Sequence, residues 1–146
     1  MKSSTTEILK KYHSIAVVGI SRSEDKDAYK IPRYMKNQGY TIIPINPFAN
    51  EILGEKCYRS LLEMPKTVQS TVDIVNIFRP SKDALEVVEK AVKMKRIVDR
   101  PFVIWMQLGI VNEEAAELAR RDGIEVVMDR CLLVEHKRML HGDKHK

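Results

Sequence analysis

The loop after the first hydrophobic run of the chain has the residue types that bind phosphate. Residues 14–30 read SIAVVGISRSEDKDAYK, so an apolar stretch breaks at a glycine and gives way to serines and charged residues. Backbone amides, hydroxyl groups and cationic side chains at the start of a helix attract anions. The candidate phosphate-binding residues of this loop are Gly19, Ile20, Ser21, Arg22, Lys26 and Lys30. Its three acidic residues are typical of an ordinary solvent-exposed loop, and the residues alone leave both interpretations open.

The same loop lacks the glycine spacing of a dinucleotide-binding site. The fingerprint G-x-G-x-x-G uses its glycines for a tight turn, for close approach of the pyrophosphate and for helix packing. Residues 19–24 read GISRSE and keep only the first glycine, and Asn46 stands where an acidic residue would bind the ribose. The chain also lacks the G-x-x-x-x-G-K-[ST] motif of a P-loop. NAD(P) is therefore the less favoured cofactor, and a P-loop nucleotidase is excluded.

Five apolar runs must position this loop, because they predict the strands of a sheet. They cover residues 15–19, 41–46, 72–78, 102–107 and 124–129. Each run is rich in Ile and Val and nearly continuous, which is typical of strands buried on both faces of a parallel sheet. Helical segments alternate with the runs, so we predict an α/β fold: a Rossmann-like, doubly wound, mostly parallel five-stranded sheet with helices on both faces.

Four segments between the runs predict helices, over residues 3–13, 28–40, 81–95 and 112–123. Their capping residues are Ser4 with Glu7 in a capping-box spacing, Gly39, Ser81 and Asn112. Pro32 lacks an N–H and suits only the first turn of a helix, so the second helix should begin near Tyr29 or Lys30. Residues 49–71 predict only a connector with a short strand or helix.

The carboxyl ends of the predicted strands provide the candidate ligand site. Open parallel sheets bind ligands there, near the point where the strand order reverses. Beyond the first loop, the candidate residues at these ends are Asn46, Pro47, Phe78, Arg79, Ser81 and Gln107. Phe78 and Arg79 could border an adenine or an acyl chain, or they could be a packing aromatic and a surface cation.

Charge and composition limit the classes of partner. The 146 residues fit a single domain, with a core over about residues 12–138 and a flexible tail over 139–146. The net charge is +5, but residues 136–146 hold four Lys or Arg against one Asp, so no nucleic-acid-binding face is predicted. No run reaches the roughly 20 apolar residues of a membrane span, and the N-terminal residues lack the apolar core of a signal peptide. We expect a cytoplasmic protein without membrane attachment.

Cysteines and histidines form neither a catalytic nor a metal-binding pattern. Cys57 and Cys131 are far apart and outside any C-x-x-C motif, so both are expected to be reduced thiols. The four histidines fall mostly near the end of the chain, without the spacing of zinc ligands. No Ser/His/Asp or Cys/His arrangement is visible. The sequence predicts no metal site and no catalytic residue, and it indicates a binding protein rather than an autonomous enzyme.

Together, the strand-end motifs resemble those of the stand-alone coenzyme A-binding proteins, which are similar to the N-terminal domain of the succinyl-CoA synthetase α subunit. The segments that carry the resemblance are VVGIS, GYTIIPINP, ILGEKCYRSL, VDIVNIFRPS, IWMQLGIVNEEAAELARRDGIEVVMDRC and the pair Glu135 and Arg138. The resemblance covers roughly residues 12–138, nearly the whole chain. The combination of NP, FR, QLGI and MDRC at successive strand ends is far more specific than any one of them.

The resemblance implies that the ligand is coenzyme A (CoA) or an acyl-CoA. It implies that residues 19–22, with Lys26 or Lys30, lie at the phosphates and that Asn46 and Pro47 border the ligand. It also implies that Phe78, Arg79 and Ser81 line the path of the adenine or the pantetheine. Gln107 would lie at the pantetheine end. Catalysis is not implied, because the synthetase uses a phosphorylated histidine from a second domain and no histidine stands at a strand end here.

Cys131 and the biological role leave alternatives open. Cys131 follows the fifth strand beside Arg130, where a cation and a helix start would make a thiol more reactive. It could form a mixed disulfide with the CoA thiol, or it could be a buried structural cysteine. The favoured role is a non-catalytic CoA carrier, sensor or regulatory module, free or as a homodimer. The alternatives are a small NAD(P)- or CoA-dependent enzyme and a subunit that docks on a larger acyl-CoA ligase supplying an ATP-grasp domain.

Overall fold

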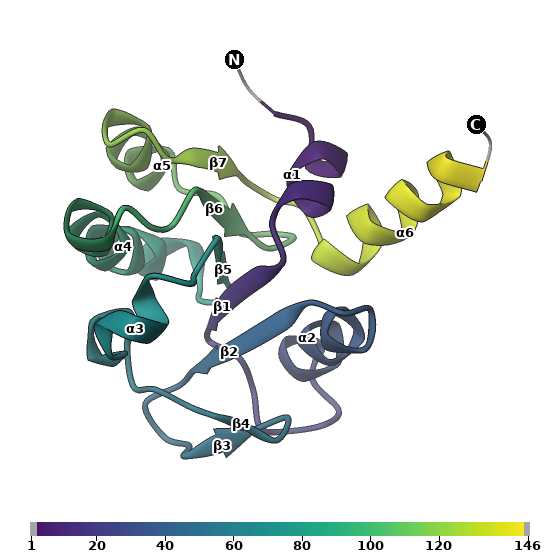
Figure 1. Ribbon diagram of the computed structural model, residues 1–146, viewed down its shortest axis with the longest axis horizontal. Coiled ribbons are helices and arrows are strands. Elements are labelled where there is room, and N and C mark those ends of the chain that lie inside the picture. Colours follow the sequence, from purple (N-terminus) through teal and green to yellow (C-terminus); the bar gives the residue numbers. More distant parts are fainter. Residues whose placement is uncertain (1–2, 145–146) are drawn as a thin grey trace.

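The computed structural model describes residues 3–144 and places a five-stranded parallel sheet at the centre of the molecule (Figure 1). The strands are β1 (Ser14–Val18), β2 (Thr41–Ile45), β5 (Ile74–Ile77), β6 (Val103–Met106) and β7 (Glu125–Val127). Their order across the sheet is β2-β1-β5-β6-β7, and every neighbouring pair is parallel. The predicted fold class is confirmed; four strands lie within the apolar runs, and β1 begins one residue before its run.

Helices cover both faces of this sheet (Figure 1). On one side lie α1 (Thr5–Lys11), α2 (Asp27–Asn37) and α6 (Leu132–Lys144), and on the other lie α3 (Lys66–Gln69), α4 (Ala84–Val98) and α5 (Glu113–Arg121). Residues 49–71, the predicted connector, also form the antiparallel pair β3 (Glu51–Ile52) and β4 (Glu55–Lys56) and the 3-10 turn η1 (Leu61–Glu63).

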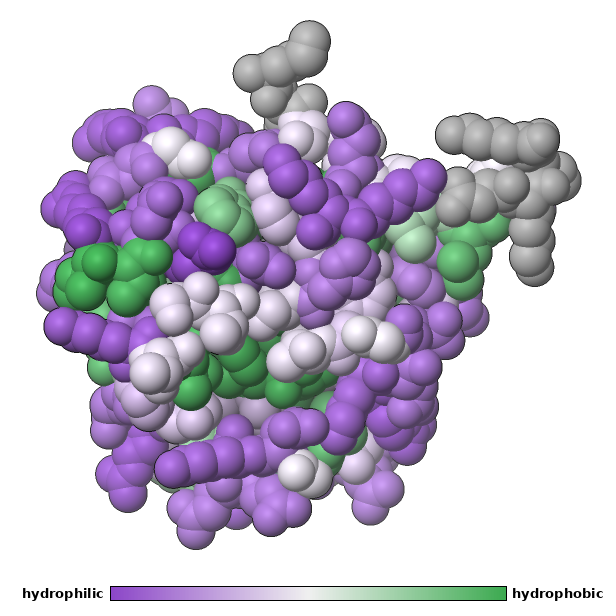
Figure 2. Space-filling view, viewed as in Figure 1, coloured by the Kyte–Doolittle hydropathy of each residue, from purple (hydrophilic) through white to green (hydrophobic). Residues whose placement is uncertain are grey.

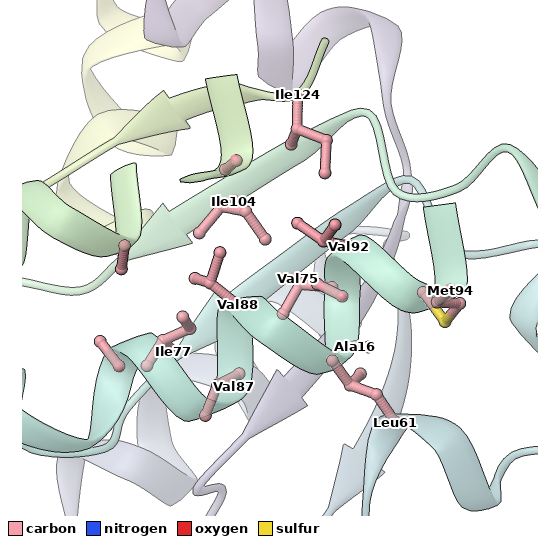
Figure 3. Close-up of a cluster of buried hydrophobic side chains, with 14 of the residues drawn as sticks. Ala16, Leu61, Val75, Ile77, Val87, Val88, Val92, Met94, Ile104 and Ile124 are labelled. Carbon is pink, nitrogen blue, oxygen red and sulfur yellow. The ribbon is translucent and has the colours of Figure 1, made fainter. Parts of the chain in front are cut away.

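Two hydrophobic cores explain why the apolar runs are continuous. Alternate residues of a strand point to opposite faces of the sheet. In β1, Ile15 and Val17 join the core under α1, α2 and α6, whereas Ala16 joins the core under α4 and α5. Figure 3 shows the second core, where Val88 and Val92 of α4 face the sheet. The face seen in Figure 2 is mostly hydrophilic, and hydrophobic surface shows in a recessed band near its centre and in patches at its left and right edges.

The capping predictions are confirmed at two helices and wrong at one. The Ser4–Glu7 capping box is present at α1, and Asn112 accepts a hydrogen bond from the Ala115 amide at α5. Ser81, the predicted cap of α4, instead lies in the 3-10 turn η2 (Ser81–Asp83) that precedes this helix. Its hydroxyl accepts from the Val111 amide (3.0 Å), so it ties η2 to the loop after β6.

The prediction that α2 begins near Tyr29 or Lys30 is wrong, because the helix starts at Asp27 and keeps Pro32 in its second turn. A proline has no N–H to donate to the carbonyl four residues earlier. The Ala28 carbonyl, left without that donor, accepts a hydrogen bond from the Ser21 amide instead (3.0 Å). The loop after β1 therefore supplies the bond that the proline removes from the helix.

Helix α6 corrects the predicted tail over residues 139–146. The chain is helical from Leu132 to Lys144, and residues 145–146 lie outside the described residues. The first turns pack on the sheet, where Glu135 and His136 are buried. The Glu135 carboxylate accepts a hydrogen bond from the Thr5 hydroxyl of α1 (2.7 Å). The helix therefore depends on tertiary contacts that its own sequence does not reveal.

His136 is expected to make the stability of the protein depend on pH. Its Nδ1 lies 2.8 Å from the Tyr34 hydroxyl, and its ring packs edge-on against Tyr34 and Tyr40. Burial lowers the pKa of His136 below its ordinary value. An unfolded histidine binds a proton near a pKa of about 6.5, so the unfolded chain takes up this proton at a higher pH than the folded chain.

The free energy of unfolding should therefore fall as the pH drops below about 6.5, where the unfolded chain binds the proton more readily, and above about pH 7 the protonation of His136 should no longer change it. His136→Gln should show a smaller loss than the wild type between about pH 7 and pH 5. Urea unfolding at these two pH values measures the difference, with His13→Gln as a control at an exposed histidine. Equal losses in wild type and His136→Gln would contradict the assignment.

Candidate functional site

A cleft of about 390 Å³ opens at the carboxyl ends of β2, β1 and β5. The strand order reverses there, because β2 and β5 lie on opposite sides of β1. Such a point is where open α/β sheets bind ligands. Apolar residues line its interior: Val18, Ile45, Leu61, Phe78 and Val87. The other lining residues are Gly19, Asn46, Pro47, Phe48, Arg59, Ser60, Arg79, Pro80, Asp83, Glu86 and Lys90.

The cleft gathers some of the predicted site residues and leaves others outside. Five of them line it: Gly19, Asn46, Pro47, Phe78 and Arg79. Seven do not: Ile20, Ser21, Arg22, Lys26, Lys30, Ser81 and Gln107. The residues outside the cleft are those of the loop that leads into α2 and of the start of this helix, together with Ser81 in η2 and Gln107 after β6.

Gly19, directly after β1, lies close to the backbone that follows β5. Its φ of +92° lies in a region that favours glycine. A Cβ built there would stand 3.1 Å from the carbonyl carbon of Phe78 and 3.3 Å from the amide nitrogen of Arg79. Only glycine therefore fits without displacing the tip of β5, and the bare backbone leaves room for a ligand to approach closely.

The loop after Gly19 uses its hydrogen-bonding groups internally. Ile20 is fully buried, and the Ser21 amide is bonded to the Ala28 carbonyl. The Ser21 hydroxyl accepts from the Ser23 amide (2.9 Å). The backbone amides of Ser21 and Ser23 are thus already paired within the protein, so neither is left for a phosphate.

The cations of the same loop also lie away from the interior of the cleft. Lys26 and Lys30 are exposed at the start of α2. Arg22 reaches the rim, because its Nη1 donates a hydrogen bond to the Phe48 carbonyl (3.0 Å). Of the three predicted cations, Arg22 is the one that is held next to a lining residue of the cleft.

Asn46 connects the loops that follow β1 and β2. Its Nδ2 donates to the Ile20 carbonyl (2.9 Å), and its Oδ1 accepts from the Phe48 amide (2.7 Å). The Cys57 thiol lies 3.5 Å from the Asn46 carbonyl oxygen, and burial raises the pKa of this thiol. An aspartate would lack the Nδ2 donor, which explains why an amide stands where dinucleotide-binding folds place an acid.

Sequence reasoning named Arg79 but missed Arg59 and Lys90, the other two cations that line the cleft. Arg79 pairs with Asp83 (3.4 Å), and Lys90 pairs with Glu86 (3.8 Å). Arg59 lines the cleft without a hydrogen-bond or ion-pair partner among the side chains that the structure describes.

Only part of this set had a signal in the sequence. The helical spacing of residues 83, 86, 87 and 90 places them on one face and could have indicated Lys90. Arg59 lies in the connector for which no element could be predicted.

Gln107 and Cys131 follow β6 and β7, the strands that lie on the side of the sheet away from β2. Gln107 is buried at the tip of β6, and its Oε1 accepts from the Leu132 amide at the start of α6 (3.4 Å). Asn76 of β5 also donates to this oxygen (3.3 Å). Cys131 is half-buried just before α6, and neither it nor Gln107 lines the cleft. A bond between the Cys131 and CoA thiols stays a prediction.

The described residues, 3–144, contain neither a metal-binding cluster nor a membrane-spanning helix. Their His, Cys, Asp and Glu side chains form no group of three that could hold a metal ion. None of their helices has both the length and the apolar composition needed to cross a bilayer.

Three comparisons with known proteins point to one family. The family model described as CoA binding domain matches residues 13–137. Uncharacterized protein YneT of Bacillus subtilis is 39% identical over 135 residues, which are 92% of this chain and 93% of that protein. The structure of a hypothetical protein from Pyrococcus horikoshii superposes with a TM-score of 0.83 at 36% identity, covering 93% of this chain and 89% of the other.

A longer relative matches over only part of its length. Acetate–CoA ligase [ADP-forming] of Methanocaldococcus jannaschii is 34% identical over 120 residues, which are 82% of this chain but 17% of the ligase. The chain thus corresponds to one segment of that enzyme.

Proposed function

The chain belongs to the CoA binding domain family, and on that premise we propose that it binds coenzyme A or an acyl-CoA in the cleft between the tips of β2, β1 and β5. We propose that it serves as a non-catalytic carrier, sensor or regulatory module. The observation that carries the proposal is the cleft itself: an apolar interior lined by three cationic and two acidic side chains, at the point where the strand order reverses.

The lining residues suggest how the two ends of the nucleotide would lie. Phe78 and Val87 offer apolar surface to an adenine ring. The backbone at Gly19 has no side chain to keep a pyrophosphate away, and Arg22 stands at the adjoining rim with N–H groups left to donate. Asn46 would border the ligand while holding the two loops in place. The pantetheine would then extend along the strand tips toward β6.

CoA should raise the melting temperature, because a ligand that binds only the folded state stabilises it by mass action. At a concentration of about 100 times Kd the gain is about 2.7 kcal/mol, which corresponds to a shift of roughly 5–10 °C for a chain of this size. Thermal unfolding with millimolar CoA, acetyl-CoA and NAD measures it. The absence of a shift with CoA and acetyl-CoA would refute the proposal, and a larger shift with NAD would favour the dinucleotide alternative.

A second candidate is a subunit that docks on a larger acyl-CoA ligase. The observation that favours it is the similarity of the chain to 17% of the length of an acetate–CoA ligase. In this role the chain would present CoA to a partner that carries the catalytic groups. Co-purification of a larger ligase subunit would favour this candidate over a free binding protein.

A further inference from the structure

We propose that Arg59 makes the cleft selective for nucleotides that carry a phosphate on the ribose in addition to the pyrophosphate. Within the proposed function, on which this inference rests, Arg59 would distinguish CoA from dephospho-CoA, which lacks the 3′-phosphate. The proposal rests on the position of Arg59 in the sheet, on the charges of the cleft and on the fixed backbone around this residue.

The position of Arg59 separates it from the pyrophosphate. Tyr58 extends the sheet beyond β2, since its amide donates to the Pro44 carbonyl (3.0 Å) and its carbonyl accepts from the Asn46 amide (2.9 Å). Gly19 follows β1, which pairs with the opposite side of β2. Adjacent strands lie about 4.8 Å apart, so the backbones at Gly19 and Arg59 are roughly 10 Å apart. A phosphate group that binds Arg59 is therefore not the same phosphate group of the ligand as one that lies over Gly19.

The charges of the cleft favour a phosphate at this end. Arg79 and Lys90 are each paired with a carboxylate of the α4 side, so their charges are largely compensated. Asp83 and Glu86 would also repel a phosphate placed close to α4. Arg59 lines the same cleft with no such partner in the described part of the chain. Its guanidinium has five N–H donors in a planar fork that suits bidentate contact with phosphate.

The backbone that carries Arg59 is held in place before any ligand binds. Besides the two bonds of Tyr58, the Cys57 amide donates to the Asn50 carbonyl (2.9 Å). The Lys56 ammonium lies 5.4 Å from the centre of the Tyr58 ring, so this neighbouring cation has its own contact. Arg59 thus combines a fixed backbone with a side chain that makes no hydrogen bond, ion pair or ring contact with the described residues.

Isothermal titration of the wild type and of Arg59→Met with CoA and with dephospho-CoA tests the proposal. The wild type should bind CoA at least about 10-fold more tightly than dephospho-CoA, since a hydrogen bond between charged groups is worth about that factor or more. Arg59→Met should lose about 10-fold in affinity for CoA and should bind dephospho-CoA as the wild type does. Arg59→Lys should keep part of the discrimination, because it keeps the charge and loses the fork.

Arg121→Met is the matched control, because Arg121 is an exposed arginine at the end of α5, outside the cleft. It should leave both affinities unchanged, and melting curves without ligand verify that each variant folds. Equal affinity of the wild type for CoA and dephospho-CoA, or an equal loss for both in Arg59→Met, would overturn the role of Arg59 and leave the proposed function standing. Failure of the wild type to bind either compound would overturn both.

Discussion

Gly19→Ala is expected to lower the affinity for CoA by roughly 100-fold and the free energy of unfolding by about 1–3 kcal/mol. The φ of +92° is unfavourable for alanine, and the new methyl group would stand 3.1 Å from the backbone of Phe78. Relief of this contact requires the tip of β5 to move, and Phe78 and Arg79 of the cleft would move with it. Calorimetric titration with CoA and urea unfolding measure the two effects.

Gly39→Ala separates the contact from the backbone conformation. Gly39 has a similar φ of +98°, but a Cβ there meets no atom within 4 Å, and the residue lies at the end of α2 outside the cleft. This variant should also lose stability and should bind CoA with unchanged affinity. Wild-type CoA affinity in a folded Gly19→Ala protein would show that the ligand does not depend on this strand tip.

Asn46→Asp alone is expected to lower the affinity for CoA by about 100-fold. Aspartate cannot donate to the Ile20 carbonyl, so the loops after β1 and β2 lose one of the two hydrogen bonds of this side chain. A buried acceptor that loses its donor costs about 1–3 kcal/mol. The new carboxylate would also face the Ile20 oxygen and would repel the phosphates of CoA. The affinity is measured by calorimetry and the stability by urea unfolding.

Asn112→Asp provides the same chemical change outside the cleft. The Asn112 side chain also makes two hydrogen bonds. Its Nδ2 donates to the Ser81 carbonyl (2.9 Å), and its Oδ1 accepts from the Ala115 amide (2.9 Å). This variant should lose a similar amount of stability and should keep its affinity for CoA. A comparable loss of affinity in both variants would mean that general destabilisation, rather than the position of Asn46, weakens binding.

The sheet could be predicted because its signal is local. Five Ile- and Val-rich runs of strand length require burial on both faces, and a doubly wound sheet satisfies that requirement. The resemblance carried by the strand-end motifs could likewise be predicted, and the match of the family model to residues 13–137 confirms it. Motifs at strand ends are informative because the parallel arrangement brings all of them to one edge.

The parts that could not be predicted depend on contacts between distant residues. Glu135 and His136 are polar, and no local pattern indicates that they are buried; Thr5 and Tyr34 supply the hydrogen-bonding partners that allow it. Arg59 lines the cleft because Tyr58 pairs with β2, and no sequence pattern in residues 49–71 predicts this pairing.

The start of α2 could not be predicted for a similar reason. Ser21, from the loop before this helix, replaces the hydrogen bond that Pro32 cannot make.

That replacement bears on the entropy of ligand binding. The Ala28 carbonyl that Pro32 leaves free holds Ser21, and the Ser21 hydroxyl in turn holds Ser23, so this loop is ordered before a ligand arrives. Fixing the backbone of a mobile residue costs about 1–2 kcal/mol in lost conformational freedom. Here that loss of conformational freedom is part of the free energy of folding, so it does not reduce the affinity for a ligand. A proline that weakens a helix therefore preorganises the loop beside the cleft.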